Sequence, residues 1–338
     1  MRSFAYTRAA DVADAVRQIA SDPEARFVAG GTNLIDLMKA NVAQPSRLID
    51  ISRLPLNTVE QIADGGVRIG ALVPNTDLAY HPLVETRYPL LSSAILAGAS
   101  QQLRNMASSG GNLMQRTRCY YFYDTAASCN KRAPGTGCAA LTGRNRIHAI
   151  LGASESCIAT HPSDMCVALA VLEAKVRTLS AGGERVIPIK EFHRLPGDTP
   201  QIDTNLRSDE IITAIELPEK GLPSNYTYLK IRDRASYAFA LVSIAVGLQL
   251  DGTLIKEARF ALGGVAHKPW RDEQAEASLV GADANRESFA RAADILLRDA
   301  KGYGDNGFKI ALARRGIIRG LTQAAAGTPQ SQSDKRIR

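Results

Sequence analysis

The chain has 338 residues, of which 45% are hydrophobic and 22% charged, and its formal net charge is +7. This length allows two domains, and the composition is that of an ordinary globular protein. The positive charge is not gathered into a run of Lys and Arg, which disfavours a nucleic-acid partner; a mildly basic surface suits anionic ligands or an acidic partner subunit. No apolar run approaches the ~20 residues of a membrane span, so we expect no membrane insertion. The first residues lack the apolar core of a signal peptide, so we expect no export signal here.

The N-terminal segment combines two helical patterns with two strands and a glycine turn. Apolar residues recur at three-to-four spacing over 8–21, which predicts an amphipathic helix. A short strand over 26–29 meets the turn 30–33 (Gly-Gly-Thr-Asn), an apolar-periodic helix over 34–39 follows, and 47–51 predicts the next strand of a βαβ unit. Glycines followed by a Thr or Asn cap and free N–H groups can bind a phosphate. A tight turn without a ligand explains this stretch equally well, and the lack of G-x-G-x-x-G after any strand disfavours a Rossmann fold.

The middle of the chain alternates hairpin signals with short helical patterns. Residues 59–71 carry a hairpin signal around an Asp-Gly-Gly turn. After it we expect helices over 75–79 and 89–97. Beyond the cysteines, the expected elements are a strand over 156–159, a helix starting at 162–164, a hairpin over 173–189 and a strand over 210–217.

The last third of the chain predicts a separate α+β domain. A boundary is expected at the stretch 218–224, which contains two prolines and a glycine. The expected elements beyond it are strands over 226–231, 241–250 and 254–262 and helices over 272–280, 286–299 and 307–324. The polar residues 327–338 predict a flexible tail.

Four of the five cysteines lie in one irregular stretch. Cys119, Cys129, Cys138 and Cys157 are separated by nine, eight and eighteen residues, with five glycines and prolines among them and little periodicity. So long a loop is unusual in a compact domain unless something ties it down, and four thiolates on a metal or an iron–sulfur cluster would do so. Cys166 lies on the apolar face of the following helix and is expected in the core.

Three alternatives to an iron–sulfur cluster remain open on spacing alone. Structural zinc is disfavoured because no two of these cysteines are two to four residues apart. Two disulfides could form, with three possible connectivities. Four unrelated buried thiols in one loop are improbable. The spacing matches neither common ferredoxin pattern, so it does not by itself select iron–sulfur.

Three short motifs together resemble a known family. They are the turn over 29–34 (Ala-Gly-Gly-Thr-Asn-Leu), the turn over 110–113 (Gly-Gly-Asn-Leu) and the sequence Pro-Ser-Asp at 162–164. In this combination they resemble the FAD-binding subunit of the xanthine dehydrogenase family of molybdenum hydroxylases. The similarity is greatest to the flavin subunit of bacterial periplasmic aldehyde oxidoreductases, whose extra [4Fe–4S] cluster lies between the second and third motifs. Further matching stretches lie at 116–119, 129–132, 233–240 and 261–270.

The resemblance implies an α+β fold in two domains. Residues 1–220 would form a FAD-binding domain of the vanillyl-alcohol-oxidase type, with subdomains over about 1–55 and 56–220 and a cluster-bearing insertion over 115–158. Residues 224–326 would form a domain like the C-terminal domain of the CO dehydrogenase flavoprotein. Xanthine dehydrogenase itself lacks the insertion, which weakens the expectation of NAD as final electron acceptor.

The resemblance also implies which residues hold the cofactors. Two turns would wrap the FAD pyrophosphate, and Ser163 and Asp164 would lie near ribityl or ribose hydroxyls. Lys230 would lie near the isoalloxazine, where its charge could stabilise reduced flavin; a solvated strand lysine is the alternative. The implied FAD-binding residues are Val28, Ala29, Gly30, Gly31, Thr32, Asn33, Leu34, Ser108, Ser109, Gly111, Asn112, Ser163, Asp164, Ile211, Ile212 and Lys230. The implied [4Fe–4S] ligands are Cys119, Cys129, Cys138 and Cys157.

The implied function is that of an oxidoreductase subunit that relays electrons. A large partner subunit would oxidise an aldehyde to the acid at a molybdenum cofactor, and a small partner with two [2Fe–2S] clusters would complete a heterotrimer. FAD on this chain would receive the electrons and reduce an external acceptor. We assign no catalytic residue, and His148, His161, His193 and His267 are interpreted as structural. The alternatives are the flavin subunit of a hydroxybenzoyl-CoA reductase and a zinc-stabilised, non-catalytic binding module.

The resemblance favours a periplasmic location, reached by co-export with a signal-bearing partner. Without such a partner the chain would stay cytoplasmic.

Overall fold

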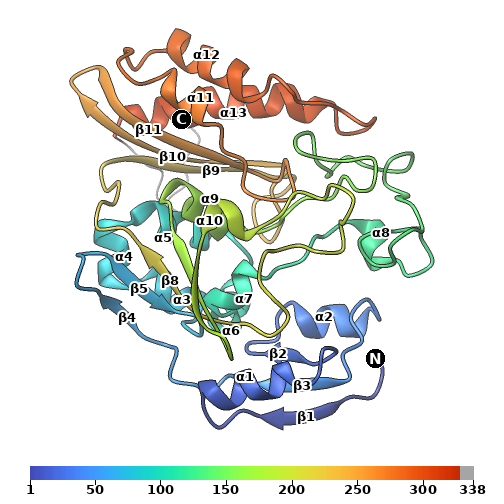
Figure 1. Ribbon diagram of the computed structural model, residues 1–338. Helices are drawn as coiled ribbons and strands as arrows, with labels where there is room; N and C mark the ends of the chain where they lie inside the picture. The colour runs from blue at the N-terminus through green and yellow to red at the C-terminus, as the bar shows by residue number, and fades with distance from the viewer. Residues whose placement is uncertain (328–338) are drawn as a thin grey trace.

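The computed structural model describes residues 1–327, which form three sheets stacked from one end of the molecule to the other (Figure 1). The N-terminal sheet lies at the bottom of that view, a mixed layer of sheet and short helices in the middle, and a sheet covered by long helices at the top. The prediction of a flexible tail over 327–338 falls, apart from Gly327, outside the described residues.

The N-terminal sheet is parallel, in the order β1-β3-β2. Its strands are β1 (Ala5–Arg8), β2 (Arg26–Val28) and β3 (Arg47–Asp50), and its helices are α1 (Val12–Ala20) and α2 (Leu34–Lys39). The predicted βαβ unit is thereby confirmed. The first helix starts later than residue 8, because Asp11 is extended and its side chain caps the helix by accepting from the amide of Asp14.

The middle sheet is antiparallel, with strands distant in sequence at its centre. Its order is β4-β5-β8-β6-β7. The strands are β4 (Val59–Gln61), β5 (Val67–Gly70), β6 (Lys175–Ser180), β7 (Gly183–Pro188) and β8 (Ile211–Leu217). The helices around it are α3 (Asn75–Ala79), α4 (Pro82–Arg87), α5 (Pro89–Ala97), α6 (Gln101–Met106), α7 (Ser109–Leu113), α9 (Asp164–Val171) and α10 (Ile189–Phe192).

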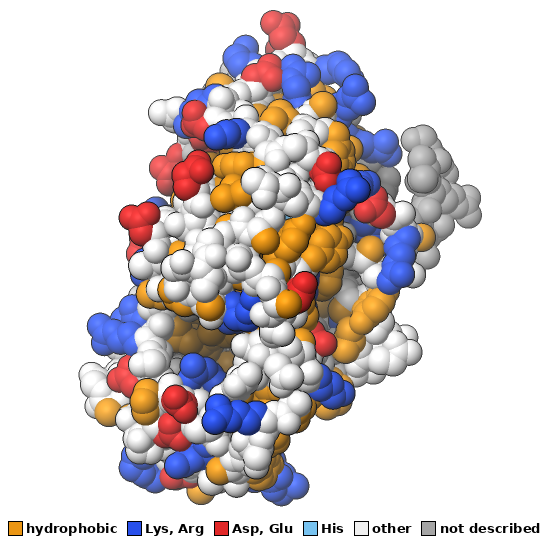
Figure 2. All heavy atoms as spheres, turned by 90° about the vertical axis from the view of Figure 1, so that its right-hand side faces the viewer, with side chains coloured by type: hydrophobic (Ala, Val, Ile, Leu, Met, Phe, Trp, Pro, Cys, Tyr) orange, Lys and Arg blue, Asp and Glu red, His pale blue; other side chains and the backbone are white. Residues whose placement is uncertain are grey.

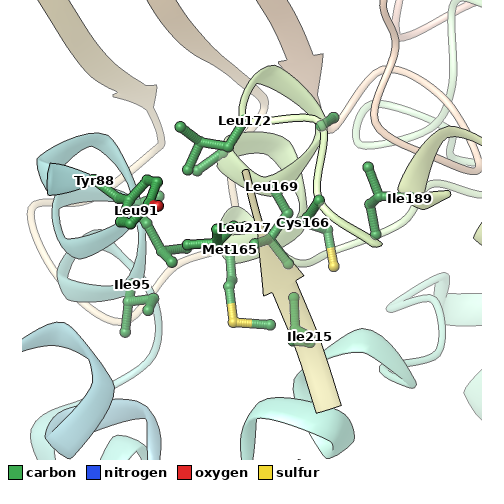
Figure 3. Close-up of a cluster of buried hydrophobic side chains, with 14 of the residues drawn as sticks. Tyr88, Leu91, Ile95, Met165, Cys166, Leu169, Leu172, Ile189, Ile215 and Leu217 are labelled. Atoms are coloured by element: carbon green, nitrogen blue, oxygen red, sulfur yellow. The ribbon is translucent and has the colours of Figure 1, made fainter. Parts of the chain in front are cut away.

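Helix α9 lies in the largest core cluster. All eight of its residues are buried, because it is enclosed by α5, the middle sheet and the C-terminal strands. Figure 3 shows Met165 and Leu169 of α9 between Leu91 of α5 and Ile215 of β8. The start of this helix, which carries the third motif, is therefore held from every side.

The C-terminal sheet is antiparallel and packs on both faces. Strands β9 (Asn225–Ile231), β10 (Val242–Asp251) and β11 (Leu254–Gly263) form it. Ile244 and Val246 of β10 face helices α11 (Glu273–Ala277), α12 (Arg286–Leu296) and α13 (Phe308–Ala325), whereas Ala245 faces the core around α9. Successive side chains of a strand point to opposite faces, so a strand buried on both faces contributes in turn to two cores.

The stretch 115–158 contains little regular structure. Its one helix within the described chain is α8 (Tyr120–Tyr123), and the rest is turns with isolated bridges such as Cys129–Cys138. The predicted strand over 156–159 is wrong: Ser154 and Cys157 form only one isolated bridge, with no neighbouring strand long enough to extend it. Among residues 1–327, none of the helices has the length and apolarity needed to cross a bilayer.

Candidate functional site

The first glycine turn leaves its backbone donors free. Gly31 has φ of +71°, a conformation that favours glycine, and α2 begins three residues later at Leu34. The amides of Gly30, Gly31, Thr32 and Asn33 donate no hydrogen bond within residues 1–327. All residues over 28–34 are half-buried. The turn is thus a row of unused N–H groups at the start of a helix.

The first turn touches the residues that precede the second. A Cβ on Gly30 would lie 1.8 Å from the carbonyl oxygen of Met106, so only glycine fits this approach. Asn33 occupies the N-cap position of α2, as expected, but its side chain makes no cap bond with this helix. Its Oδ1 accepts instead from the backbone amide of Arg116 at 3.0 Å. Asn33 therefore links the turn to the start of the cysteine stretch.

The second turn uses its donors for its own support. The amide and hydroxyl of Ser109 both donate to the carbonyl oxygen of Val73, at 2.9 Å each, and the Gly110 amide donates to Ala71 at 2.7 Å. Ser108 caps the short helix α7 by accepting from the Gly111 amide at 3.2 Å. Ser109 is wholly buried and anchors the turn; its role as a FAD-binding residue stays a prediction.

The third motif meets the second directly. The Ser163 hydroxyl donates to Asn112 Oδ1 at 2.6 Å and accepts from the amide of Cys166 as the cap of α9. The two motifs are more than fifty residues apart in sequence. The fold thus brings all three motifs together, as the resemblance implies.

Asp164 and Lys230 form a buried ion pair. Lys230 Nζ lies 2.8 Å from Asp164 Oδ2 and donates to the carbonyl of Ala97 at 3.0 Å, and its side chain is 1% exposed. Tyr228 donates to Asp164 Oδ1 at 2.6 Å; burial and the Asp164 charge raise the pKa of Tyr228 far above its usual value, so it stays protonated. Lys230 is therefore not the solvated strand lysine of the alternative interpretation.

Ile211 and Ile212 point to opposite sides of β8. Ile211 packs in the cluster that includes the N-terminal sheet, and Ile212 packs in the cluster around α9. Successive strand residues face opposite ways, and the predicted contact of both isoleucines with a flat ring of FAD stays a prediction.

The four clustered cysteines surround one small cavity. Cys119, Cys129, Cys138 and Cys157 all line it, and all five cysteines of the chain are free thiols, so the disulfide alternative is not realised. Burial raises the pKa of Cys119 to about 11, whereas a hydrogen bond from Cys157 lowers the pKa of Cys138 to about 6. Cys166 lies apart from them in the core, as expected.

The spacing of these thiols is wider than a single ion requires. Across residues 1–327, no three of the four come within 4.8 Å of one another. A tetrahedral zinc ion, with Zn–S bonds of about 2.3 Å, holds its sulfurs about 3.8 Å apart. As placed here, the four thiols therefore do not form a closed zinc site.

Charged side chains that the sequence patterns did not single out hold the cysteine stretch in place. Lys131, with 2% of its side chain exposed, pairs with Asp203 and donates to the carbonyl of Pro200 at 2.6 Å. Arg116 bonds the other oxygen of Asp203 at 2.6 Å. Burial alone would raise the pKa of Asp203, but the two cations outweigh it and lower the pKa to about 2. Neighbouring Arg132 donates to the carbonyl of Tyr121 at 2.7 Å.

One buried histidine contacts a clustered thiol. His148 Nε2 lies 3.0 Å from Cys119 Sγ, and burial lowers the pKa of His148 to about 4, which keeps the ring neutral. Its backbone carbonyl accepts from Lys309 at 2.7 Å, which fixes its position. The sequence does not indicate this contact, because His148 and Cys119 are 29 positions apart.

A groove of about 660 Å³ opens between the cysteine stretch and the end of α2. The face of the molecule in Figure 2 is hollowed in its lower half. The groove is lined by Met1, Arg2, Asn41, Val42, Gln44, Thr125 and Arg132. None of the predicted site residues lines it.

Comparisons with known proteins agree with this arrangement. Residues 2–220 match the family of the FAD-binding domain in molybdopterin dehydrogenase, and residues 227–324 match the CO dehydrogenase flavoprotein C-terminal domain. The chain is 51% identical to the aldehyde oxidoreductase FAD-binding subunit PaoB of Escherichia coli (strain K12), over 96% of this chain and 99% of that one. It is 29% identical to the glyceraldehyde dehydrogenase medium chain of Sulfolobus acidocaldarius, over 83% of each.

The fold is shared with a solved structure. Carbon monoxide dehydrogenase from Hydrogenophaga pseudoflava matches with a TM-score of 0.76 at 26% identity, over 97% of this chain and 99% of that chain. The expected α+β class, with a FAD-binding domain followed by a CO dehydrogenase flavoprotein C-terminal domain, is confirmed. The chain belongs to the FAD-binding medium-subunit family of the molybdenum hydroxylases.

Proposed function

We propose that this chain is the electron-transfer flavoprotein subunit of a molybdenum-containing aldehyde oxidoreductase. The observation that carries the proposal is the meeting of the three motifs, in a chain 51% identical to an aldehyde oxidoreductase subunit. The backbone amides of residues 30–33 donate no hydrogen bond within the described residues, so they are available to the oxygens of a diphosphate. Asn33 Nδ2 is also buried without a hydrogen-bond partner within the described residues.

Different residues of the chain would hold different parts of FAD. The turn 30–33 would bind the pyrophosphate, and Asn112 with Ser163 would fix the relative position of the second and third motifs. Lys230, already paired with Asp164, would supply a positive charge near the isoalloxazine. FAD, when bound, supplies the exchange between two-electron and one-electron chemistry. The protein contributes binding, orientation and charge.

We also propose that the cysteine stretch holds a [4Fe–4S] cluster through Cys119, Cys129, Cys138 and Cys157. Four free thiols around one enclosed cavity fit such a group, and their wide spacing disfavours zinc. The cluster, when bound, supplies one-electron transfer. The ion pairs of Lys131 and Asp203 would keep the stretch in a fixed position beside the flavin motifs.

The partners in this proposal are a large molybdenum-cofactor subunit and a small [2Fe–2S] subunit. Medium subunits of this family are found in carbon monoxide dehydrogenase and related multi-subunit enzymes. An aldehyde would be oxidised on the large subunit, and an external acceptor would be reduced at FAD.

The test is purification with the natural partners, followed by flavin, iron and molybdenum analysis. We expect one FAD and about four iron atoms on this chain, in addition to the iron of a small subunit. The variant Cys138→Ser should lose the four iron atoms and keep FAD, whereas the control His81→Gln, at a histidine that does not line the thiol cavity, should keep both. Zinc without flavin would indicate the binding-module alternative, and activity only with an acyl-CoA and a reductant would indicate the reductase.

Location is a separate proposal, namely export to the periplasm together with a signal-bearing partner. Cell fractionation with and without the partner's signal tests it. Periplasmic recovery should disappear when the signal is deleted, and recovery that persists without the signal would contradict the co-export route.

A further inference from the structure

A second group of metal-ligand residues lies away from the clustered cysteines. One ligand atom each of His161, Cys166 and His193 lies within 4.8 Å of the other two. The three come from different places: the loop before α9, the first turn of α9 and the residue that ends α10. Their exposed fractions are 9%, 0% and 2%. No step of the proposed function uses them.

Ring nitrogens of both histidines are buried without a partner. These are His161 Nε2 and His193 Nδ1, which have no hydrogen bond within residues 1–327. The rings lie against each other with centroids 4.2 Å apart and tilted by 53°. A buried polar atom without a partner costs about 1–3 kcal/mol, so some group is expected to bond these atoms.

The other nitrogen of His193 already has the contact that a metal-bound histidine usually has. His193 Nε2 lies 2.8 Å from the carbonyl oxygen of Leu113, to which it can donate. This donation leaves Nδ1 with a free lone pair, and a carbonyl that accepts from the far nitrogen is the usual support of a histidine ligand. Burial keeps the ring neutral by lowering the pKa of His193 to about 4.

His161 can adopt the matching form at small cost. Its Nδ1 accepts from the Ser163 amide over a long 3.4 Å contact. Ligation through Nε2 would place the proton on Nδ1 and give up only that contact. Burial lowers the pKa of His161 well below its usual value, so this ring is also neutral.

From this geometry we propose that His161, Cys166 and His193 bind a Zn²⁺ ion, with a water molecule as fourth ligand. Zinc accepts both imidazole nitrogen and thiolate sulfur, and three protein ligands with one water complete its four-coordinate shell. Binding would release the Cys166 thiol proton to solvent and form one Zn–S and two Zn–N bonds. No oxidation is involved.

The ion would secure the third flavin motif. His161 and Cys166 flank Ser163, whose hydroxyl bonds Asn112, and His193 is bonded to the carbonyl of Leu113 in the second motif. The proposed zinc would therefore lock the 161–166 turn to α10 and α7 together. This inference does not depend on the [4Fe–4S] proposal, because the ligands are different.

The experiment is metal analysis of the full chain, purified with its natural partners, combined with zinc K-edge X-ray absorption. We expect about one zinc per chain, with nitrogen ligands at about 2.0–2.1 Å and one sulfur at about 2.3 Å. The variants His193→Gln and Cys166→Ala should each lose zinc while keeping the iron of the cysteine stretch. His81→Gln, whose histidine lies outside this group, should keep both metals.

Two results would overturn the proposal. One is absence of zinc, after growth in zinc-supplemented medium, from a preparation that retains its flavin and iron. The other is a zinc signal with four sulfur ligands that is lost in Cys138→Ser, which would place zinc in the cysteine stretch. The X-ray absorption of the unaltered protein decides between these outcomes even if a variant does not fold.

Discussion

The flavin motifs and the cysteine stretch are neighbours held in place by different means. The second motif turn is supported mainly by backbone bonds, such as those from Ser109 and Gly110 to the loop that follows β5. The stretch over 115–158 has one short helix and is fixed by buried side chains, above all Lys131 with Asp203. The first region is thus shaped before any cofactor binds. The second depends on charges and, in our proposal, on its cluster.

The largest expected effect comes from Gly30→Ala, which tests whether backbone approach shapes the motif region. The new Cβ would meet the Met106 carbonyl at 1.8 Å, and this backbone atom cannot turn aside. Forcing the turns apart should cost about 3 kcal/mol, or roughly a hundredfold in flavin affinity. Flavin fluorescence during titration of the flavin-free protein would measure it.

The control for that variant is Gly182→Ala, in the hairpin between β6 and β7. Its Cβ would meet only the Ser180 hydroxyl, at an ordinary 3.5 Å. Equal flavin affinity in the two variants would contradict the close approach of the two turns.

Asp203→Asn tests the charge-dependent region. Removal of the carboxylate leaves Lys131 buried without its partner, which should cost about 3 kcal/mol at neutral pH. The Asp203 pKa of about 2 lies below its usual 3.8, so its stabilisation is present above pH 4 and is lost as the pH falls toward 2. The difference in urea midpoint between the two proteins should shrink over that range.

The matched control is Asp299→Asn, an exposed acid whose ion pair with Arg298 is on the surface. It should change the midpoint little at any pH. A difference for Asp203→Asn that stays constant from pH 7 to pH 3 would show that the pair is not the source of the stabilisation.

The motif region was the more predictable from sequence, for a physical reason. Glycine turns and helix caps are local, so residues such as Gly31 and Ser163 reveal their role within a few positions. Asp203 lies 72 positions from Lys131, and nothing around it marks it as a buried partner. The bond of the Asn33 side chain could not be predicted from the sequence, because its oxygen accepts from a residue 83 positions away and not from its own helix.

Asn33→Ala tests the bond that joins the two regions. It removes the acceptor of the Arg116 amide, a bond worth about 1 kcal/mol, and the unpartnered Nδ2 donor beside the proposed pyrophosphate site. We expect flavin affinity to fall about fivefold to tenfold, with iron content unchanged. Asn33→Asp keeps the acceptor but places a negative charge near the phosphates, so its loss of affinity should be larger. The opposite order would rule out a phosphate at this turn.

His148→Gln should have the smallest effect, and it tests whether the cysteine stretch is tuned by its buried neighbours as well as held by them. In the tautomer with a proton on Nε2, His148 donates to Cys119 Sγ. A donor to a ligand sulfur stabilises the more negative, reduced state of a cluster. Loss of about 1 kcal/mol of that stabilisation lowers a one-electron potential by about 40 mV.

Redox titration by electron paramagnetic resonance would measure the shift. The control His193→Gln should leave the potential unchanged, because His193 makes no bond to any of the four thiols in the described chain. A purely structural role for His148 would instead reduce the iron content and leave the potential of the remaining clusters where it was.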